Sequence, residues 1–318
     1  MLYSGDTGFY SGASGLLTPL RALGIPARVY PGVSSIQLLS AALGRPWQDW
    51  KLVSAHGCAC DPVAECMMNR SVFFLTGGTE TPASLCQKLT DAGMGEAHGV
   101  VGENLGTEAE AIRYGSAAEL AGQSFAPLSV LLVENFDLPQ LRAPGFPDES
   151  FIRSEVPMTK QEVRAAALAK LAVMPTDTLW DVGAGTGSVS VELALAAPKG
   201  RVYAVECEPD ACELIRKNRA KFHACNLILI EGRAPDVLAD LPAPDAVFIG
   251  GTKGGMEAVL DEVLGKNPNA RICISAIALE TLALPFAARR RPGPDRRVTH
   301  DRVTPHETGG DCTCSSDH

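Results

Sequence analysis

Short apolar runs alternate with amphipathic helical stretches along most of the chain, a pattern typical of α/β proteins. In the first half, strand-like runs are predicted at residues 28–30, 51–54, 71–75, 99–101 and 128–133. In the second half they are predicted at 178–182, 201–205, 227–231, 246–250 and 271–276, with helical segments between them. This regular alternation predicts a parallel sheet with helices on both faces, which is a doubly wound domain.

The periodicity stops between residues 136 and 151, a stretch that contains Pro139, Pro144, Gly145 and Pro147. Such a composition is typical of an interdomain linker. A chain of 318 residues is also long enough for two domains with separate cores. We therefore predict a first domain over residues 1–137, a linker over 138–152 and a second domain over 153–286.

From residue 287 onward the chain becomes rich in arginine and proline and has no strand-like run. Residues 287–318 are therefore expected to form a disordered or non-native tail. A basic tail that binds an acidic partner is the alternative interpretation.

A helix is predicted just before the first strand of the second domain. The segment Thr159-Lys160-Gln161-Glu162 has the form of a capping box, in which Thr159 caps the helix and Glu162 reaches back to it. Val163, Ala167 and Leu171 then share one face, which is expected to be buried.

The segment Trp180-Asp181-Val182-Gly183-Ala184-Gly185-Thr186-Gly187 joins the predicted strand 178–182 to a predicted helix at 188–196. Glycines at such a turn let a ligand approach the backbone, and the amides of the helix start point at its polar atoms. Glu206 follows the next strand, nineteen positions after Gly187, where a carboxylate can accept hydrogen bonds from both hydroxyls of a ribose. Together they predict a site for a nucleoside cofactor.

Two other interpretations of the glycine loop are open. A nicotinamide cofactor would favour G-x-G-x-x-G, whereas these glycines fall at 183, 185 and 187 after Asp181, a D-x-G-x-G-x-G arrangement that resembles class I methyltransferases. A glycine-rich turn without a ligand is the other possibility, and the position of Glu206 argues against it. The spacing therefore favours S-adenosylmethionine as the cofactor.

Composition narrows the class of protein further. No apolar run approaches the roughly 18 residues of a membrane helix, and the net charge of -9 disfavours nucleic-acid binding. The ten cysteines are scattered, which suits reduced thiols in a cytoplasmic protein without structural disulfides. A metal site could be formed by His56, Cys58 and Cys60, or by Cys312 and Cys314. Structural zinc sites usually have paired C-x2-4-C knuckles, which these residues lack, so we interpret the cysteines as thiols in loops. No metal is predicted.

Several motifs in both halves resemble the fused methyltransferases of cobalamin biosynthesis, in which a tetrapyrrole methylase precedes a class I methyltransferase. In the first half the resemblance rests on residues 4–11, 31–37, 54–57 and 101–106. In the second half it rests on 159–164, the glycine loop, 231–235, 248–251 and 278–281. The chain starts downstream of the family's first strand and Gly-Pro-Gly loop. The first domain is therefore expected to be truncated and not to hold the cofactor normally. Thr7 and Arg233 also depart from the family's usual residues.

The resemblance implies an α/β fold, a partial tetrapyrrole methylase domain followed by a Rossmann-like class I methyltransferase domain. It implies S-adenosylmethionine-dependent methylation of C5 and C15 of a reduced tetrapyrrole, with loss of carbon dioxide from the ring C acetate. It also suggests a homo-oligomer. The alternatives are another class I methyltransferase acting on a small molecule or RNA, and an inactive fragment that only binds cofactor.

The same resemblance implies roles for individual residues. In the second domain the candidate cofactor-binding residues are Thr159, Gly183, Ala184, Gly185, Thr186, Gly187, Glu206, Gly232 and Ala234. The matching pocket positions of the first domain are Gly5, Asp6, Ser34 and Ser35. The candidates for the substrate and its many carboxylates are Lys160, Arg164, Lys253 and His56. A helix cap remains the alternative for Thr159, surface solvation for the cations and a hydrogen-bonded structural role for His56. No general base is assigned.

Overall fold

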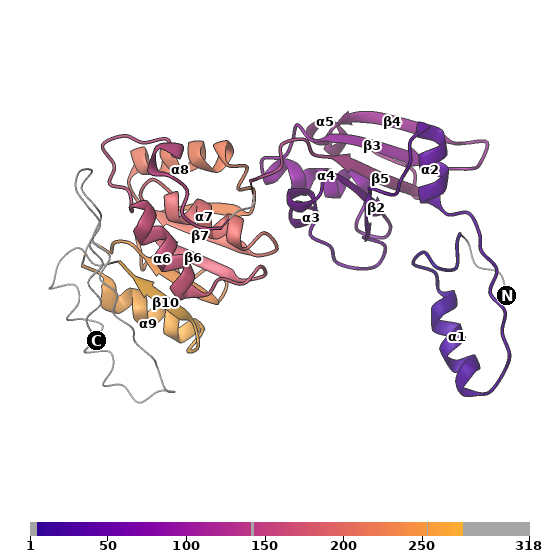
Figure 1. Ribbon diagram of the computed structural model, residues 1–318. Coiled ribbons are helices and arrows are strands. Elements are labelled where there is room, and N and C mark those ends of the chain that lie inside the picture. Colours follow the sequence, from indigo (N-terminus) through magenta and orange to yellow (C-terminus); the bar gives the residue numbers. More distant parts are fainter. Residues whose placement is uncertain (1–4, 141–142, 253, 276–318) are drawn as a thin grey trace, which may run out of the picture. The chain divides into compact units, whose positions relative to one another are not determined.

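The computed structural model describes residues 5–140, 143–252 and 254–275. It divides into two compact units, Met1–Pro139 and Gln140–His318 (Figure 1). The predicted tail at 287–318, Lys253, the motif at 278–281 and the Cys312 and Cys314 pair lie outside the described residues. None of the helices within the described ranges is long and apolar enough to cross a bilayer.

The first unit contains a mixed five-stranded sheet with the order β1-β2-β5-β3-β4. Its strands are β1 (Lys51–Ser54), β2 (Ser71–Leu75), β3 (His98–Glu103), β4 (Ala111–Ser116) and β5 (Ser129–Glu134). Its helices are α1 (Ala13–Ala22), α2 (Ser35–Leu43), α3 (Pro62–Met68), α4 (Pro82–Asp91) and α5 (Ala117–Ala121). The pair of β1 and β2 is parallel, and the other pairs are antiparallel.

Four of the five strands predicted for this half are confirmed in place, and one is wrong. Residues 28–30 form no strand, and the side chains of Val29 and Tyr30 are exposed instead of paired. Conversely, β4 was not predicted from the sequence. It pairs with β3 alone and exposes Arg113 and Tyr114, so it lacks the apolar run that marks a buried strand. The α/β class of the unit is confirmed.

The second unit has a five-stranded sheet in which every pair is parallel, with the order β10-β9-β6-β7-β8. The strands are β6 (Thr178–Val182), β7 (Arg201–Glu206), β8 (Leu227–Glu231), β9 (Ala246–Ile249) and β10 (Arg271–Ile274). The helices between and before them are α6 (Gln161–Leu171), α7 (Ser188–Ala196), α8 (Pro209–Lys221) and α9 (Met256–Lys266). The predicted strands are all confirmed, with ends that differ by at most one residue in the first four; the predicted end of the last, residue 276, lies outside the described residues.

Successive side chains along these strands point to opposite faces of the sheet and pack into two separate cores. Leu179 and Phe248 pack with residues of α6, α7 and α8, whereas Trp180 and Val247 pack with residues of α9. This alternation is the period of two that a strand buried on both faces requires. The doubly wound architecture is therefore confirmed (Figure 1).

The residues predicted as a linker belong in part to the second core. Phe146 and Phe151 are both buried, and each ring lies against Phe222, with centroids 5.2 and 4.8 Å apart. The proline and glycine content of this segment predicted a flexible linker, but its two aromatic side chains pack into the core of the second unit.

Candidate functional site

The chain reverses direction across the sheet at β6, because β7 follows on one side of it and β9 on the other. In open parallel sheets, a crevice for ligands forms at the carboxyl ends of the strands at such a point. The glycine loop lies there, between the end of β6 at Val182 and the start of α7 at Ser188. The fold therefore puts the sequence-predicted loop at its expected binding edge.

Close approach of two backbones explains Gly183. Its φ is +73°, and a Cβ added there would lie 2.2 Å from the carbonyl oxygen of Gly251, which follows β9. The amides of Gly183 and Ala184 both donate to Val205 O, at 3.0 and 3.1 Å. The loop is therefore tied to both neighbouring strands, and only glycine fits at its first position.

Glu206 ends β7 and is 8% exposed. One of its carboxylate oxygens, Oε1, accepts the amides of Cys207 and Glu208 at 2.8 and 3.0 Å, and Oε2 accepts the amide of Gly185 at 2.8 Å. These three bonds fix the carboxylate against the glycine loop. A carboxylate has about four acceptor positions, so Oε2 can still accept a bond from a ligand hydroxyl.

Asp181 and Thr186 are buried polar residues next to this loop. Ser190 on α7 donates to Asp181 Oδ2, while Asp181 Oδ1 and the Thr186 hydroxyl have no hydrogen-bond partner within the described residues. Burial, opposed by the hydrogen bond from Ser190 and aided by the nearby Glu206 carboxylate, raises the pKa of Asp181 to about 7. The site therefore contains a carboxyl group that ionises near neutral pH.

The predicted adenine-side residues follow β8, the strand next to Glu206. The amide of Gly232 donates to the backbone oxygen of Glu206 at 2.8 Å, and Ala234 packs at the edge of the α9-side core. The structure thus brings the loop, Glu206, Gly232 and Ala234 to one edge of the sheet.

Thr159 does not cap a helix, so the predicted capping box is wrong. Helix α6 begins at Gln161, and its N-cap residue, Lys160, makes no side-chain cap bond. The residues just before Thr159 do approach the site: the carbonyl oxygen of Pro157 lies 3.2 Å from the position of a Cβ added to Gly185. Thr159 therefore remains a candidate for closing the pocket.

Arg164 is not available to a substrate, which corrects its assignment. Its side chain is 0% exposed; Nε donates to Glu192 at 2.8 Å and Nη1 to Asp148 at 2.8 Å. It also donates to the carbonyls of Phe146 and Thr159. The side chain of Lys160, by contrast, is 48% exposed, with Nζ 3.5 Å from Asp148. Of these two cations, Lys160 is therefore the one that a substrate carboxylate could reach.

The four pocket positions of the first unit also come together. The amide of Asp6 donates to Ser34 Oγ at 2.6 Å, and Asp6 Oδ2 accepts the amide of Gly32 at 3.1 Å. A Cβ added to Gly5 would lie 2.7 Å from Ser34 Oγ, and Ser35 is the first residue of α2.

His56 follows β1 and stands over Gly77. Its Nδ1 lies 3.2 Å from Thr76 O, and a Cβ added to Gly77 would lie 1.8 Å from that nitrogen. The ring is thus held against the end of β2 while the residue remains exposed. Within the described ranges, no group of three or more His, Cys, Asp and Glu residues could hold a metal ion, and none of the eight cysteines there is in a disulfide.

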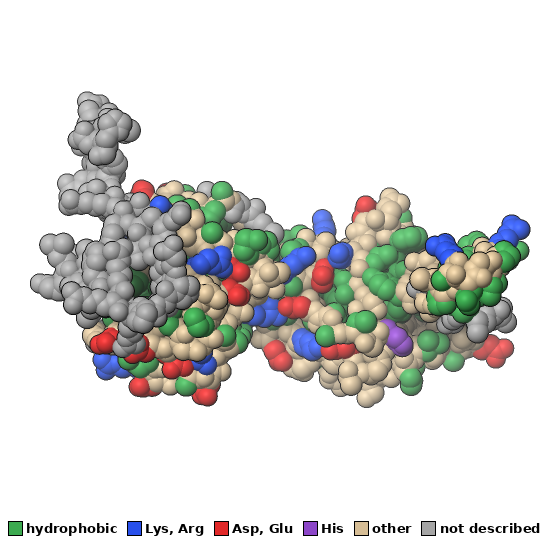
Figure 2. All heavy atoms as spheres, turned by 90° about the horizontal axis from the view of Figure 1, so that it is seen from below, with side chains coloured by type: hydrophobic (Ala, Val, Ile, Leu, Met, Phe, Trp, Pro, Cys, Tyr) green, Lys and Arg blue, Asp and Glu red, His purple; other side chains and the backbone are tan. Residues whose placement is uncertain are grey.

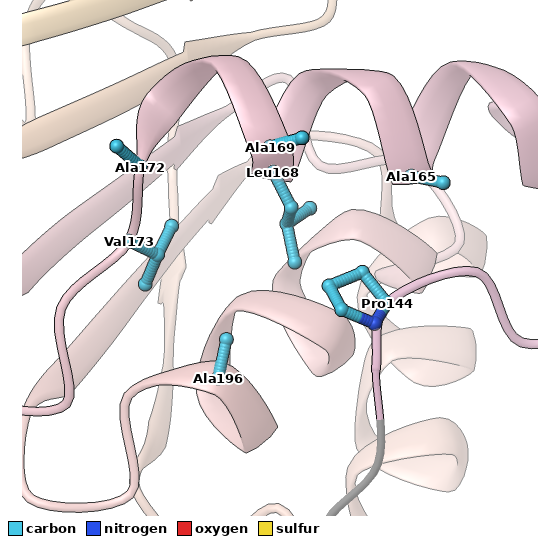
Figure 3. Close-up of a pocket in the computed structure, with 7 residues that line it drawn as sticks. All are labelled: Pro144, Ala165, Leu168, Ala169, Ala172, Val173 and Ala196. Carbon is cyan, nitrogen blue, oxygen red and sulfur yellow. The ribbon is translucent and has the colours of Figure 1, made fainter.

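A hollow of about 480 Å³ lies between α6, the end of α7 and Pro144 (Figure 3). Its lining is apolar: Pro144, Ala165, Leu168, Ala169, Ala172, Val173 and Ala196. It offers no polar side chain to a charged ligand.

On the face shown in Figure 2, Lys and Arg side chains are interspersed with Asp and Glu.

Two buried residues next to the loop were missed from the sequence, Asn218 and Glu192. Asn218 donates to the carbonyl of Thr186 at 2.9 Å, and Glu192 accepts from Arg164. Each is a polar residue on the buried side of an otherwise apolar helix face, with Leu214 and Ile215 flanking the former. That signal was present in the sequence, because a polar group among core positions needs a partner.

Comparison with known proteins agrees with both units. Residues 150–310 match the precorrin methyltransferase domain, and residues 1–121 match the tetrapyrrole (corrin/porphyrin) methylases. Precorrin-6Y C(5,15)-methyltransferase (decarboxylating) from Sinorhizobium sp is 33% identical over 298 residues, covering 91% of this chain and 71% of that protein.

A second relative and a solved structure each match a little less than half of the chain. A protein from Sulfurisphaera tokodaii, named "probable cobalt-precorrin-6B C(15)-methyltransferase (decarboxylating)", is 46% identical over 145 residues, 45% of this chain and 76% of that one. The crystal structure of precorrin-6Y C5,15-methyltransferase from Geobacter metallireducens GS-15 is 39% identical and covers 46% of this chain and 78% of that one, with a TM-score of 0.44. By its sequence matches over both units, the chain belongs to the family of decarboxylating precorrin-6Y C(5,15)-methyltransferases.

Proposed function

We propose that this chain methylates C5 and C15 of precorrin-6Y with S-adenosylmethionine and removes carbon dioxide from the ring C acetate. One observation supports the assignment of S-adenosylmethionine as the cofactor. The Gly183–Gly187 loop and Glu206 meet at the carboxyl edge of the sheet, joined by the 2.8 Å bond from the Gly185 amide to Glu206 Oε2. The family of the chain supports the substrate and the reaction.

The residues present fit an adenosyl sulfonium. Glu206 keeps acceptor capacity for a ribose hydroxyl, and the buried Thr186 hydroxyl has no hydrogen-bond partner within the described residues. Helix α7 starts directly after the loop, so its amino end is available to the methionine carboxylate. Gly232 and Ala234, which follow β8 beside Glu206, are the candidates for binding the adenine edge.

The task of the protein in this reaction is positioning. When bound, S-adenosylmethionine supplies an electrophilic methyl group on a positively charged sulfur. The methyl group would go to an electron-rich tetrapyrrole carbon, whose electron pair would form the new bond as the methyl–sulfur bond breaks. The residues that would hold the donor are the Gly183–Gly187 loop and Glu206, and holding donor and acceptor in a fixed orientation is what accelerates such a transfer. No side-chain nucleophile is needed.

Decarboxylation needs an electron sink, which the protonated tetrapyrrole itself provides. The bond between the acetate methylene and its carboxylate breaks, carbon dioxide leaves, and the electron pair enters the conjugated ring system. The protein's part is to keep the ionised acetate in a pocket that excludes water. Lys160, with its exposed side chain, and His56 are the candidates for binding the other substrate carboxylates.

Two methyl transfers consume two donor molecules. The Gly5, Asp6, Ser34 and Ser35 cluster, in which the Asp6 amide donates to Ser34 Oγ, is the matching candidate pocket in the first unit, and we expect it to bind the cofactor more weakly than the second unit does. We also expect a homo-oligomer.

Turnover with precorrin-6Y tests the proposal. The full chain is incubated with precorrin-6Y and S-adenosylmethionine labelled in the methyl group, and the tetrapyrrole product is examined by mass spectrometry and NMR. We expect two labelled methyl groups, at C5 and C15, and loss of one carboxyl group. Glu206→Ala should abolish methylation at C15. A product without label, or unchanged turnover by the variant, would refute the assignment.

A further inference from the structure

Residues 145–159, called the strap here, begin within the segment predicted as a linker and end just before α6, with little regular structure. Only a three-residue 3-10 helix, Asp148–Ser150, interrupts them. The far part of the strap contacts the glycine loop, since Pro157 O lies 3.2 Å from the position of a Cβ added to Gly185. A segment with so few backbone hydrogen bonds of its own must be held by partners on other elements.

The ends of the strap are held by one buried pair. Glu192 on α7 accepts the amides of Gly145 and Phe146, at 2.6 and 3.1 Å. Arg164 on α6 donates to the carbonyls of Phe146 and Thr159, and so joins both ends of the strap. Its guanidinium lies 4.7 Å from the centroid of the Phe151 ring.

The middle of the strap is held by Asn218, which is 0% exposed on α8. Its Oδ1 accepts the amide of Ile152 at 2.8 Å, and its Nδ2 donates to Ile152 O at 3.1 Å. The same Nδ2 donates to Thr186 O at 2.9 Å. A single amide group therefore binds both backbone groups of one strap residue and, at the same time, a carbonyl of the glycine loop.

We propose that Asn218 is a positioning residue for the cofactor site: it holds the strap in register with the glycine loop, so that residues 156–159 form one wall of the pocket. Apolar packing of Phe151 on Phe222 keeps the strap near the unit but does not fix its register. The paired bonds to Ile152 fix it, because they are directional. The proposal rests on the proposed function, since it takes the glycine loop to bind S-adenosylmethionine.

Asn218→Asp tests this, with Asn226→Asp as a matched control. Aspartate has the shape of asparagine, but its second oxygen would face the carbonyls of Ile152 and Thr186. Asn226 is 1% exposed, and its Nδ2 donates to the carbonyls of Ala194 and Ala197 at 3.0 and 2.8 Å. It precedes β8, at the opposite edge of the same sheet. Both variants thus place a carboxylate against buried carbonyls, and only one of them is near the loop.

Two measurements on the full chain are compared for the variants and the unsubstituted protein. Calorimetry gives the Kd for S-adenosylmethionine, and hydrogen–deuterium exchange without ligand reports the backbone amides of 152–156, 158 and 184–187. For Asn218→Asp we expect faster exchange in both segments and binding weaker by about tenfold, as for the loss of one buried hydrogen bond. Because S-adenosylmethionine carries both a sulfonium and a carboxylate, Asn218→Ser, which removes the same bonds without adding a charge, is measured in parallel to separate the loss of the bonds from the new charge. Asn226→Asp should leave both readouts within about twofold of the unsubstituted chain.

Unchanged exchange in the strap, or unchanged affinity in Asn218→Asp, would overturn the proposal, as would equal losses in both variants. If Asn218→Asp does not fold, Asn218→Ser removes the same bonds without the charge, and the same outcomes decide. Absence of binding by the unsubstituted chain would refute the proposed function instead. Exchange in the ligand-free protein would then still decide whether Asn218 couples the strap to the loop.

Discussion

The amide of Gly185 donates to Glu206 Oε2 at 2.8 Å, so the glycine loop and the acidic residue of the next strand are already in contact in the ligand-free protein. The two residues are 21 positions apart in the chain. The parallel pairing of β6 with β7 brings them together. A preformed arrangement of this kind lowers the ordering cost of binding a ligand.

Gly183→Ala should damage both stability and cofactor binding. The new Cβ would lie 2.2 Å from Gly251 O in a backbone with a φ of +73°, so the loop or the end of β9 must move. We expect the free energy of unfolding to fall by about 1–3 kcal/mol, and the Kd for S-adenosylmethionine to rise at least about tenfold. Urea unfolding and titration calorimetry measure the two effects.

Gly200→Ala is the control for that prediction. Its Cβ would lie 2.0 Å from Asp177 O, a similar clash at the start of β7, which is the opposite edge of the sheet. It should reduce stability but leave the affinity within about twofold, because the clash is far from the loop. Equal affinities for Gly183→Ala and Gly200→Ala would show that the loop does not contact the ligand.

Arg164→Met should strongly destabilise the second unit. It removes the buried partner of Glu192, whose side chain is 0% exposed, and so leaves an uncompensated charge. The expected loss is about 3–5 kcal/mol in the free energy of unfolding. Arg216→Met is the comparison: that side chain is 47% exposed and pairs with Glu213 and Glu231, so its loss should cost about 1 kcal/mol or less. Similar losses in urea unfolding would contradict the burial of Arg164.

The buried Asp181 should make stability fall as the pH rises. Its pKa is raised from 3.8 to about 7, so between these values the folded chain binds more protons at this site than the unfolded chain. The contribution is complete below about pH 4 and is lost as the pH passes about 7, a change of about 4 kcal/mol at 1.36 kcal/mol per unit. Asp181→Asn should remove this part of the pH dependence.

Urea unfolding of the two proteins from pH 5 to 8 measures the difference. The exposed Asp240 provides the comparison, since Asp240→Asn should keep the slope of the unsubstituted chain. Parallel curves for the unsubstituted chain and Asp181→Asn would show that the carboxyl group is not protonated in the folded protein.

The second unit was largely predictable because its central strands, β6, β7 and β9, are buried on both faces. Such strands appear as continuous apolar runs, and the run that ends at Val182 is followed at once by the glycines. The order of strands then brings Glu206 to the loop without further information. In the first unit, β4 escaped prediction because it is an edge strand whose middle residues, Arg113 and Tyr114, are exposed.

The burial of Arg164 was harder to predict, for a reason that lies in helix geometry. The sequence suggested a buried face through Val163, Ala167 and Leu171, whereas the buried residues of α6 are Arg164, Ala167, Leu168 and Leu171. A shift of the face by one residue turns an arginine from solvent into the core. From sequence patterns, cationic side chains are expected to be exposed to solvent, because a charged group is rarely buried unless an oppositely charged or hydrogen-bonding group is buried with it. Here the partner, Glu192, is on another helix.

Titration of the full chain with S-adenosylmethionine by calorimetry tests the central claim most directly, with Glu206→Ala and the surface variant Glu213→Ala measured in parallel. The unsubstituted chain and Glu213→Ala should bind with a Kd in the range of about 1 μM to 1 mM that is common for enzyme substrates. Glu206→Ala should bind at least about tenfold more weakly, because it loses a charge-assisted hydrogen bond to the ribose and the anchor of the Gly185 amide. No binding by the unsubstituted chain, or equal binding by Glu206→Ala, would contradict the account.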